Sequence, residues 1–195
     1  MEQLKIKASD GLLLAVVVFD VENPKGVIQI IHGAKEHKER YYHLIQFLNE
    51  HGYAVIISDN RGHGESLNDT YPLGYMDGID EIIADQVLVT DYMQKRYPDK
   101  PFYLFGHSFG SLISRVYLQK HDDRIDKLLL SGTVNYIPIS RFGNIVGNTL
   151  SLFSGKRGHN RWIMQIGDND ENSWVVKNPE AIKAYREDPL CTGYK

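Results

Sequence analysis

The sequence predicts an α/β fold: a mostly parallel sheet with flanking helices and a helical cap. Short apolar runs alternate with longer stretches of helical spacing, which is typical of a sheet with helices on both faces. The alternation stops after Gly132, and a stretch of different composition follows. With 195 residues, 42% of them apolar, the chain can bury one good core, so one main domain is expected.

The first part of the chain predicts a hairpin followed by a β-α-β unit. Its expected elements are, in order, strands 4–8 and 12–19, strand 26–33, helix 41–51 and strand 53–59. Ser9, Asp10 and Gly11 join the first two runs and favour a tight turn. Gly52 directly follows the helical pattern and favours its termination.

The alternation continues up to Gly132 and then changes. The expected elements are helix 79–97, strand 101–105, helix 109–121 and strand 126–132. Residues 133–190 lack a comparable strand-like run and carry only a short helical pattern over 179–186, so we interpret them as a helical cap that selects substrates. The expected organisation is a core over 1–132, a cap over 133–190 and the start of a return to the core over 191–195.

Composition excludes several classes of function. A formal net charge of −3, without long blocks of one sign, argues against a nucleic-acid partner. Cys191 is the only cysteine, so no intrachain disulfide can form and a reducing compartment is expected. The longest apolar run, Leu12 to Phe19, is too short for stable membrane insertion, and the amino terminus lacks a targeting pattern. The sequence predicts a soluble, cytoplasmic protein.

Metal and cofactor sites are not expected. The histidines and the single cysteine show no zinc-ligand spacing. Asp168, Asp170 and Asn172 occupy positions 1, 3 and 5 of a calcium loop. Ser173 and Pro179 stand where that loop requires glycine and glutamate.

The segment "GHSFG", residues 106 to 110, predicts a nucleophile elbow. Ser108 stands between Gly106 and Gly110, directly after a predicted strand and directly before a predicted helix. A bulky residue two positions from the serine would clash in such a sharp turn, so glycine is a steric requirement. The alternative is a strand-turn-helix with a chance serine, which this placement makes unfavourable.

A second segment, "IIHGAKEH", predicts the loop that completes an oxyanion hole. Acyl transfer on a serine needs two backbone N–H donors, one after the serine and one after an earlier strand. The first would be the N–H of Phe109, and the bend at Gly33 allows the N–H of Ala34 to be the second. Lys35, His37, Lys38 and Arg40 of this loop are expected to form a solvated helix start rather than a phosphate site.

Four segments together resemble one known family. "HGAKEH" (32–37), "SDNRGHGES" (58–66), "GHSFGS" (106–111) and "NPEAIKAYREDPLCTGY" (178–194) are similar, in order and content, to the monoacylglycerol lipase and lysophospholipase family of α/β-hydrolases. The resemblance implies a serine carboxylester hydrolase that cleaves a small lipid ester through an acyl-enzyme on Ser108. It implies oxyanion donors at Ala34 and Phe109, within the supporting motif His32, Gly33, Gly106, His107 and Gly110.

The resemblance also assigns a cap and shows one departure. Many members carry a second glycine where this chain has Ser111. The cap of the family usually has an apolar inner face, and either an acyl-binding surface or ordinary packing onto the core would explain its apolar residues here. These candidates are Phe142, Ile145, Val146, Leu150, Leu152 and Phe153.

The sequence offers no convincing base for Ser108. In α/β-hydrolases the acid and then the histidine follow the serine along the chain. His121 would lie about 20 Å from Ser108 along one helix, and His159 precedes the acids at 168 and 170. His32 and His37 flank the oxyanion loop, and His107 should point away from the turn. The resemblance places both missing groups beyond "DPLC", so a catalytically incomplete front part of a hydrolase is expected.

Two alternatives and one structural consequence remain open. The chain could be a related serine peptidase or general esterase, or a non-catalytic lipid-binding remnant. If the last strands are missing, strand 126–132 becomes an edge with unpaired backbone groups and exposed leucines. Such an edge favours self-association with a second copy.

Overall fold

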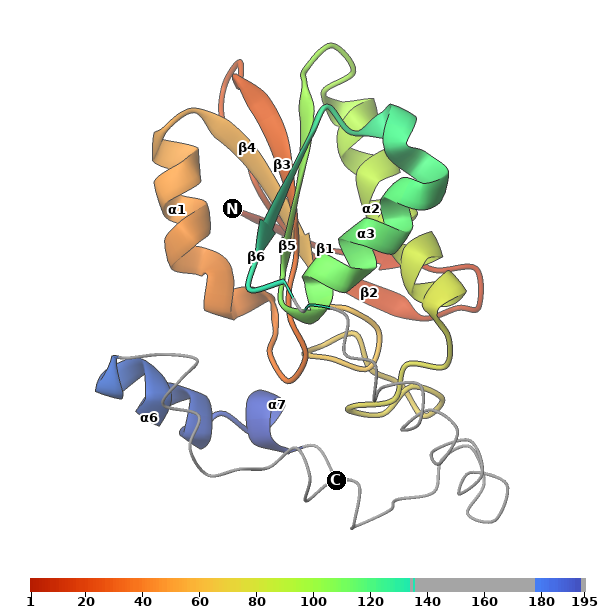
Figure 1. Cartoon of the computed structure of the whole chain (residues 1–195), viewed down its shortest axis with the longest axis vertical. Helices are drawn as coiled ribbons and strands as arrows, with labels where there is room; N and C mark the ends of the chain where they lie inside the picture. Colours follow the sequence, from red (N-terminus) through yellow and green to blue (C-terminus); the bar gives the residue numbers. More distant parts are fainter. Residues whose placement is uncertain (134, 136–177, 194–195) are drawn as a thin grey trace. The chain divides into compact units, whose positions relative to one another are not determined.

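The computed structural model describes residues 1–133, 135 and 178–193. The chain divides into two compact units, residues 1–134 with 194 and residues 135–193 with 195, and each is described by itself. The first unit is built on a six-stranded sheet (Figure 1). Its strands are β1 Glu2–Lys7, β2 Leu13–Phe19, β3 Gly26–Ile31, β4 Tyr53–Ser58, β5 Phe102–His107 and β6 Lys127–Ser131.

The sheet is mixed at one side and parallel at the other. Its spatial order is β1-β2-β4-β3-β5-β6, with β1 and β2 antiparallel to each other and β2 antiparallel to β4. The remaining four strands run parallel, which confirms the predicted α/β architecture. Each expected strand is present, and its bounds differ from the expected ones by two residues at most.

Helices cover both faces of this sheet (Figure 1). They are α1 Tyr42–Glu50, α2 Ile79–Arg96 and α3 Phe109–His121, with short 3-10 turns η1 Lys38–Tyr41 and η2 Asp122–Arg124. Ile45 of α1 packs in one cluster with Val17, Ile30 and other side chains of one face. Val89 and Met93 of α2 pack on the opposite face.

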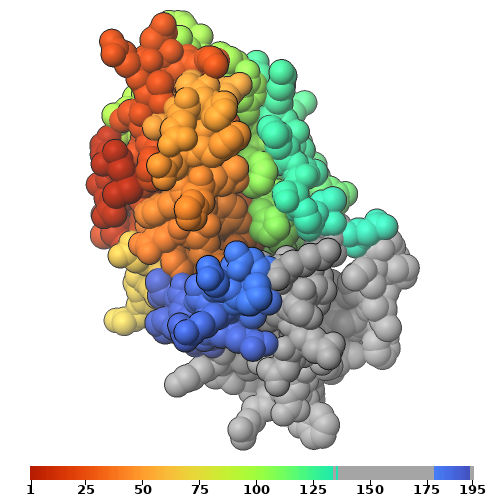
Figure 2. All heavy atoms as spheres, turned by 90° about the vertical axis from the view of Figure 1, so that its left-hand side faces the viewer, coloured from red at the N-terminus to blue at the C-terminus, as the bar shows by residue number. Residues whose placement is uncertain are grey.

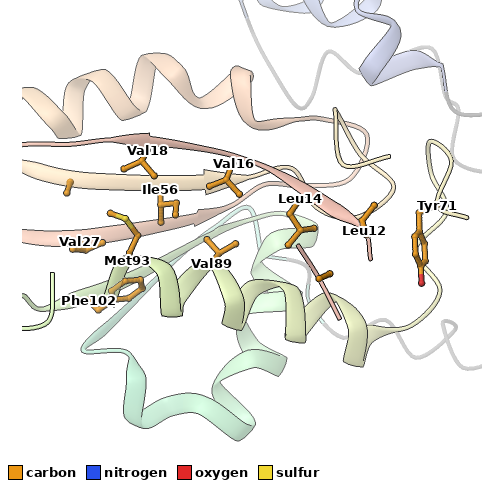
Figure 3. Close-up of a cluster of buried hydrophobic side chains, with 12 residues drawn as sticks. Leu12, Leu14, Val16, Val18, Val27, Ile56, Tyr71, Val89, Met93 and Phe102 are labelled. Carbon is orange, nitrogen blue, oxygen red and sulfur yellow. The ribbon is translucent and has the colours of Figure 1, made fainter. Parts of the chain in front are cut away.

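Figure 3 shows this second face, where side chains of β2, β3 and β4 meet α2. The cluster contains Leu14, Val16, Val18, Val27, Ile56, Val89, Met93 and Phe102. The side chains of β2 alternate between the two faces, as the period of a strand requires. Because both faces are covered, this central part of β2 is apolar throughout.

The parallel strands end at one edge of the sheet. Ile31 pairs with Gly106, and His107 pairs with Ser131, so the chain leaves β3, β5 and β6 at the same level. The residues after these strands and after β4 therefore lie close together. Ligand sites of open α/β sheets lie at this carboxyl edge.

β6 is one of the two outer strands of the sheet among the described strands, and β1 is the other. β6 pairs with β5, and Leu129 and Leu130 on it are 48% and 38% exposed. Figure 2 shows the teal segment around β6 at the surface, beside the orange α1. The expected edge is therefore present.

The described part of the second unit contains two short helices, α6 Pro179–Glu187 and α7 Pro189–Thr192. Each begins with proline after a side-chain cap: Asn178 accepts the N–H of Glu180, and Asp188 accepts the N–H of Leu190. Cys191 is buried and, as the one cysteine of the sequence, forms no intrachain disulfide. None of the helices in the described ranges combines the length and apolarity that a membrane span requires.

Candidate active site

Ser108 occupies a strained turn between β5 and α3. Its φ is +51° and its ψ is −115°, a conformation that residues other than glycine rarely adopt. Its N–H donates to the carbonyl of Ser131 at the end of β6, with 2.9 Å between nitrogen and oxygen. The structure thus places the serine in the geometry expected of a nucleophile elbow.

Both elbow glycines are required by contacts with backbone. A Cβ on Gly106 would lie 2.5 Å from the carbonyl oxygen of Gly110. A Cβ on Gly110 would lie 2.7 Å from the carbonyl oxygen of His32 and closer still to that of Ile31. The second contact reaches the strand before the predicted oxyanion loop, so Gly110 allows the elbow and that loop to approach each other.

Gly33 brings the loop after β3 directly against the serine. A Cβ on Gly33 would lie 3.2 Å from the Cβ of Ser108. The neighbouring Ala34 is exposed, and Phe109 is the first residue of α3. Among hydrogen bonds between described residues, none engages the N–H of Ala34 or of Phe109. Both N–H groups are therefore available as donors beside Ser108.

His32 orients the peptide that carries the first of these donors. Its Nδ1 lies 2.7 Å from the carbonyl oxygen of Gly33, and its Nε2 accepts the N–H of Asn60 at 2.9 Å. The proton of the neutral ring therefore sits on Nδ1 and is donated to Gly33. The N–H of Ala34 belongs to the same planar trans peptide and points the opposite way, away from the His32 ring.

His32 is a structural group and not a base. It is fully buried, and burial, followed by the nearby His63, lowers its pKa from 6.5 to about 3. Both ring nitrogens are engaged, so the ring stays neutral and cannot accept the proton of Ser108.

His107 and His121 are also turned to other partners. Nδ1 of His107 lies 3.3 Å from Oγ of Ser131, and its ring packs edge-on against Tyr41. His121 is the last residue of α3 and packs against Tyr117. His159 lies outside the described residues. The expectation that neither His107 nor His121 serves as the base agrees with these contacts.

The loop after β3 is anchored by a buried ion pair that the sequence did not reveal. Nζ of Lys38 lies 2.8 Å from Oδ2 of Asp59, and the two side chains are 3% and 0% exposed. Asp59 also accepts the N–H groups of Lys38 and Glu65, at 2.7 and 2.8 Å. The expectation of a solvated Lys38 was wrong, because a carboxylate from the end of β4 neutralises it.

The electrostatics of this pair keep Lys38 charged. Burial alone would lower the pKa of Lys38, but the Asp59 and Glu65 carboxylates outweigh burial and the pKa is raised. Removal of Asp59 would leave the buried Lys38 charge with only the exposed Glu65 carboxylate as its partner.

Glu36 is a second anchor that the sequence did not reveal. Its Oε1 accepts the N–H of Gly33 at 2.5 Å and the hydroxyl of Tyr41 at 2.8 Å. The only signal in the sequence was its place within "HGAKEH", which carried the family resemblance but assigned no role to the carboxylate.

The segment after β4 is fixed in turn to α2. Arg61 donates two hydrogen bonds to Asp85, at 2.7 and 2.8 Å, and one to Asp10 at 2.8 Å. Gly64 adopts a φ of +51°, and a Cβ there would fall on the Asp59 carboxylate. The motif "SDNRGHGES" therefore has a structural role: it holds Asn60 where it bonds to His32 and Asp59 where it bonds to Lys38.

The predicted acyl-binding residues lie outside the described residues. They are Phe142, Ile145, Val146, Leu150, Leu152 and Phe153.

A family model described as Serine aminopeptidase, S33 matches residues 22–195. The chain belongs to this family. The resemblance inferred from the four motifs is confirmed by relatives with matching names. A monoglyceride lipase of Homo sapiens is 35% identical over 86% of this chain and 52% of its own length. A phospholipase of Bacillus subtilis is 35% identical over 85% of this chain and 66% of its own length.

A solved structure gives the same fold. A thermostable carboxyl esterase from Bacillus coagulans, in complex with glycerol, superposes with a TM-score of 0.83 at 27% identity and covers 97% of this chain and 66% of that one. The α/β-hydrolase fold is thereby confirmed. The chain spans between about half and two thirds of the length of the first curated relatives that it matches, from 52% to 66%.

Proposed function

We propose that this chain carries the nucleophile and the oxyanion hole of a serine hydrolase that cleaves small lipid esters such as monoacylglycerols or lysophospholipids. The observation that carries the proposal is the close approach of the β3 loop to the strained elbow: a Cβ added to Gly33 would lie 3.2 Å from the Cβ of Ser108. Relatives named as monoglyceride lipase and phospholipase support the substrate class.

The chemistry follows from this arrangement. Oγ of Ser108 attacks the ester carbonyl carbon and passes its proton to a base. The carbonyl oxygen gains the negative charge and accepts hydrogen bonds from the N–H groups of Ala34 and Phe109. Collapse of the intermediate expels the alcohol, which takes up a proton, and leaves an ester on Ser108. Water then cleaves that ester and releases the fatty acid.

The chain by itself is expected to turn over slowly. His32, His107 and His121 are all placed away from the role of base. Without the acid and base, the oxyanion hole and substrate binding are expected to leave a rate acceleration of roughly 10³- to 10⁴-fold over the uncatalysed reaction.

The test is covalent labelling of Ser108 by a fluorophosphonate, followed by intact mass, together with hydrolysis assays on a panel of substrates. The panel contains a monoacylglycerol, a lysophospholipid, a p-nitrophenyl ester and an aminoacyl anilide, the last because the family description names an aminopeptidase. We expect slow labelling that Ser108→Ala abolishes. Equal labelling of Ser108→Ala would refute the nucleophile, and rapid turnover lost in Ser108→Ala would refute the missing base.

Self-association through β6 is a separate proposal. Among the described strands β6 pairs only with β5, so one side of its backbone has no described strand beside it, and the side chains of Leu129 and Leu130 are exposed; together these form a template for another strand. We expect a concentration-dependent increase in mass by sedimentation that Leu129→Lys reduces. A monomer at all concentrations would refute this proposal.

A further inference from the structure

Ser111 is a buried side chain beside the elbow with no role in the proposed reaction so far. It is fully buried in the first turn of α3. Its hydroxyl lies 2.6 Å from the carbonyl oxygen of Ser108, and its N–H donates to the same oxygen at 2.9 Å. One residue therefore satisfies this carbonyl twice.

The carbonyl of Ser108 belongs to the peptide that carries the second oxyanion donor. That peptide joins the carbonyl carbon of Ser108 to the nitrogen of Phe109. Because a trans peptide is planar, holding its oxygen on one side fixes the N–H on the other. Ser111 therefore acts on the Phe109 N–H as His32 acts on the Ala34 N–H.

The Ser111 hydroxyl has a second, longer contact. Its Oγ lies 3.1 Å from Oγ1 of Thr133, which is the acceptor there. A hydroxyl has one proton to donate, and the shorter of the two contacts is the one to the Ser108 carbonyl.

The same helix supplies an internal comparison. Oγ of Ser114 donates to the carbonyl of Gly110 at 2.8 Å, and Ser114 is as fully buried as Ser111. Serine commonly bonds back to a carbonyl of the preceding turn in a helix. The peptide that follows Gly110 carries the N–H of Ser111, which is not an oxyanion donor, so of these two serines only Ser111 holds a peptide of the oxyanion hole.

We propose that Ser111 is a positioning residue that aims the Phe109 N–H at the developing oxyanion. This inference rests on the proposed function, because it assumes that the Phe109 N–H stabilises an oxyanion formed on Ser108.

The experiment measures the second-order rate constant for phosphonylation of Ser108 in the whole chain by a fluorophosphonate, using intact mass. In that step Oγ forms a bond to phosphorus, fluoride leaves with the bonding electrons, and the serine proton passes to solvent. The phosphoryl oxygen occupies the oxyanion position, so the rate reports on the two N–H donors. Unfolding in urea is measured for every variant.

The variants separate positioning from stability. Ser111→Ala and Ser111→Gly remove the hydroxyl and are expected to slow labelling about 10-fold, less than the loss of a whole oxyanion donor. Ser114→Ala removes a matched buried hydrogen bond, so it should lower stability by a similar amount while labelling stays within about 2-fold. Ser111→Thr should restore the rate.

The outcomes are distinguishable. Equal labelling rates for Ser111→Ala, Ser111→Gly and Ser114→Ala would overturn the role of Ser111. Wild-type chain that is not labelled, or labelling that persists in Ser108→Ala, would overturn the proposed function and the inference with it.

Discussion

The elbow after β5 and the loop after β3 present the two oxyanion donors, but they are held in different ways. The elbow depends on residues close to it in sequence: Gly106, Gly110 and Ser111, the last three positions from Ser108. The loop after β3 also has a local contact, from Glu36 to Gly33, but its anchors are Asn60 and Asp59. They lie 28 positions from His32 and 21 positions from Lys38.

This difference predicts how substitutions should affect each half of the site. A local turn is specified by the steric demands of a few neighbouring residues, so substitutions there act on the backbone itself. A loop held by buried polar groups from another strand end depends on every partner being present, because each unpaired group costs free energy. Four substitutions or conditions test this contrast.

The largest expected effect is at the anchor of the β3 loop. Asp59→Ala should lower the free energy of unfolding by about 3–5 kcal/mol, because it removes the buried partner of the Lys38 charge and leaves only the exposed Glu65 carboxylate. Urea unfolding measures this. Glu65→Gln is the control: the Glu65 side chain is 59% exposed, and its pair with Lys38 should contribute about 1 kcal/mol or less. Similar losses for the two variants would contradict the assigned anchor.

The next effect is at the point where the two regions meet. Gly110→Ala should lower the free energy of unfolding by about 3 kcal/mol, because its Cβ would clash with the carbonyls of Ile31 and His32. Gly11→Ala is the control, since Gly11 has a φ of +90° and open space around it, and strain alone should cost about 1 kcal/mol. A stable Gly110→Ala chain with unchanged labelling would show that the elbow and loop do not approach this closely.

A matched pair at His32 separates the donor from the acceptor. The amide nitrogen of His32→Asn can replace Nδ1 and keep the bond to Gly33, whereas the amide oxygen of His32→Gln can replace Nε2 and keep the bond to Asn60. Each variant loses one buried hydrogen bond, which should lower the free energy of unfolding by about 1–3 kcal/mol. Phosphonate labelling should fall about 10-fold in His32→Gln and stay near wild type in His32→Asn. The reverse order would refute the orientation of Ala34 by His32.

The smallest expected effect is the dependence of stability on pH. His32 has a folded pKa of about 3, below its ordinary 6.5, and burial also lowers the pKa of His63. The unfolded chain therefore binds more protons as pH falls below about 6.5, and stability present at neutral pH is lost toward pH 3. Each histidine contributes at most about 1.4 kcal/mol per pH unit. Urea unfolding between pH 7 and 5.5 should show this slope, and His32→Asn should reduce it; an unchanged slope would show that His32 is not buried as a neutral ring.

The sequence by itself determined the elbow and the sheet. Gly106 is needed for a contact within a short turn, and strands buried on both faces are mostly apolar, so both features are visible along the chain. Ser108, Ala34 and Phe109 were predicted from the motifs that carry them, and their roles remain predictions.

Only the tertiary structure decided the roles of the polar residues around the site. Lys38 was expected in solvent and is buried. His32 was assigned only to the supporting motif and is a neutral positioning group, and Glu36, Asn60 and Ser111 had no assigned role. The sequence shows that these residues are polar, but not which partner each one meets. A buried polar group is stabilised only by a complementary atom within hydrogen-bond distance, and for Lys38 and His32 that atom comes from the end of another strand, which only the folded sheet brings near.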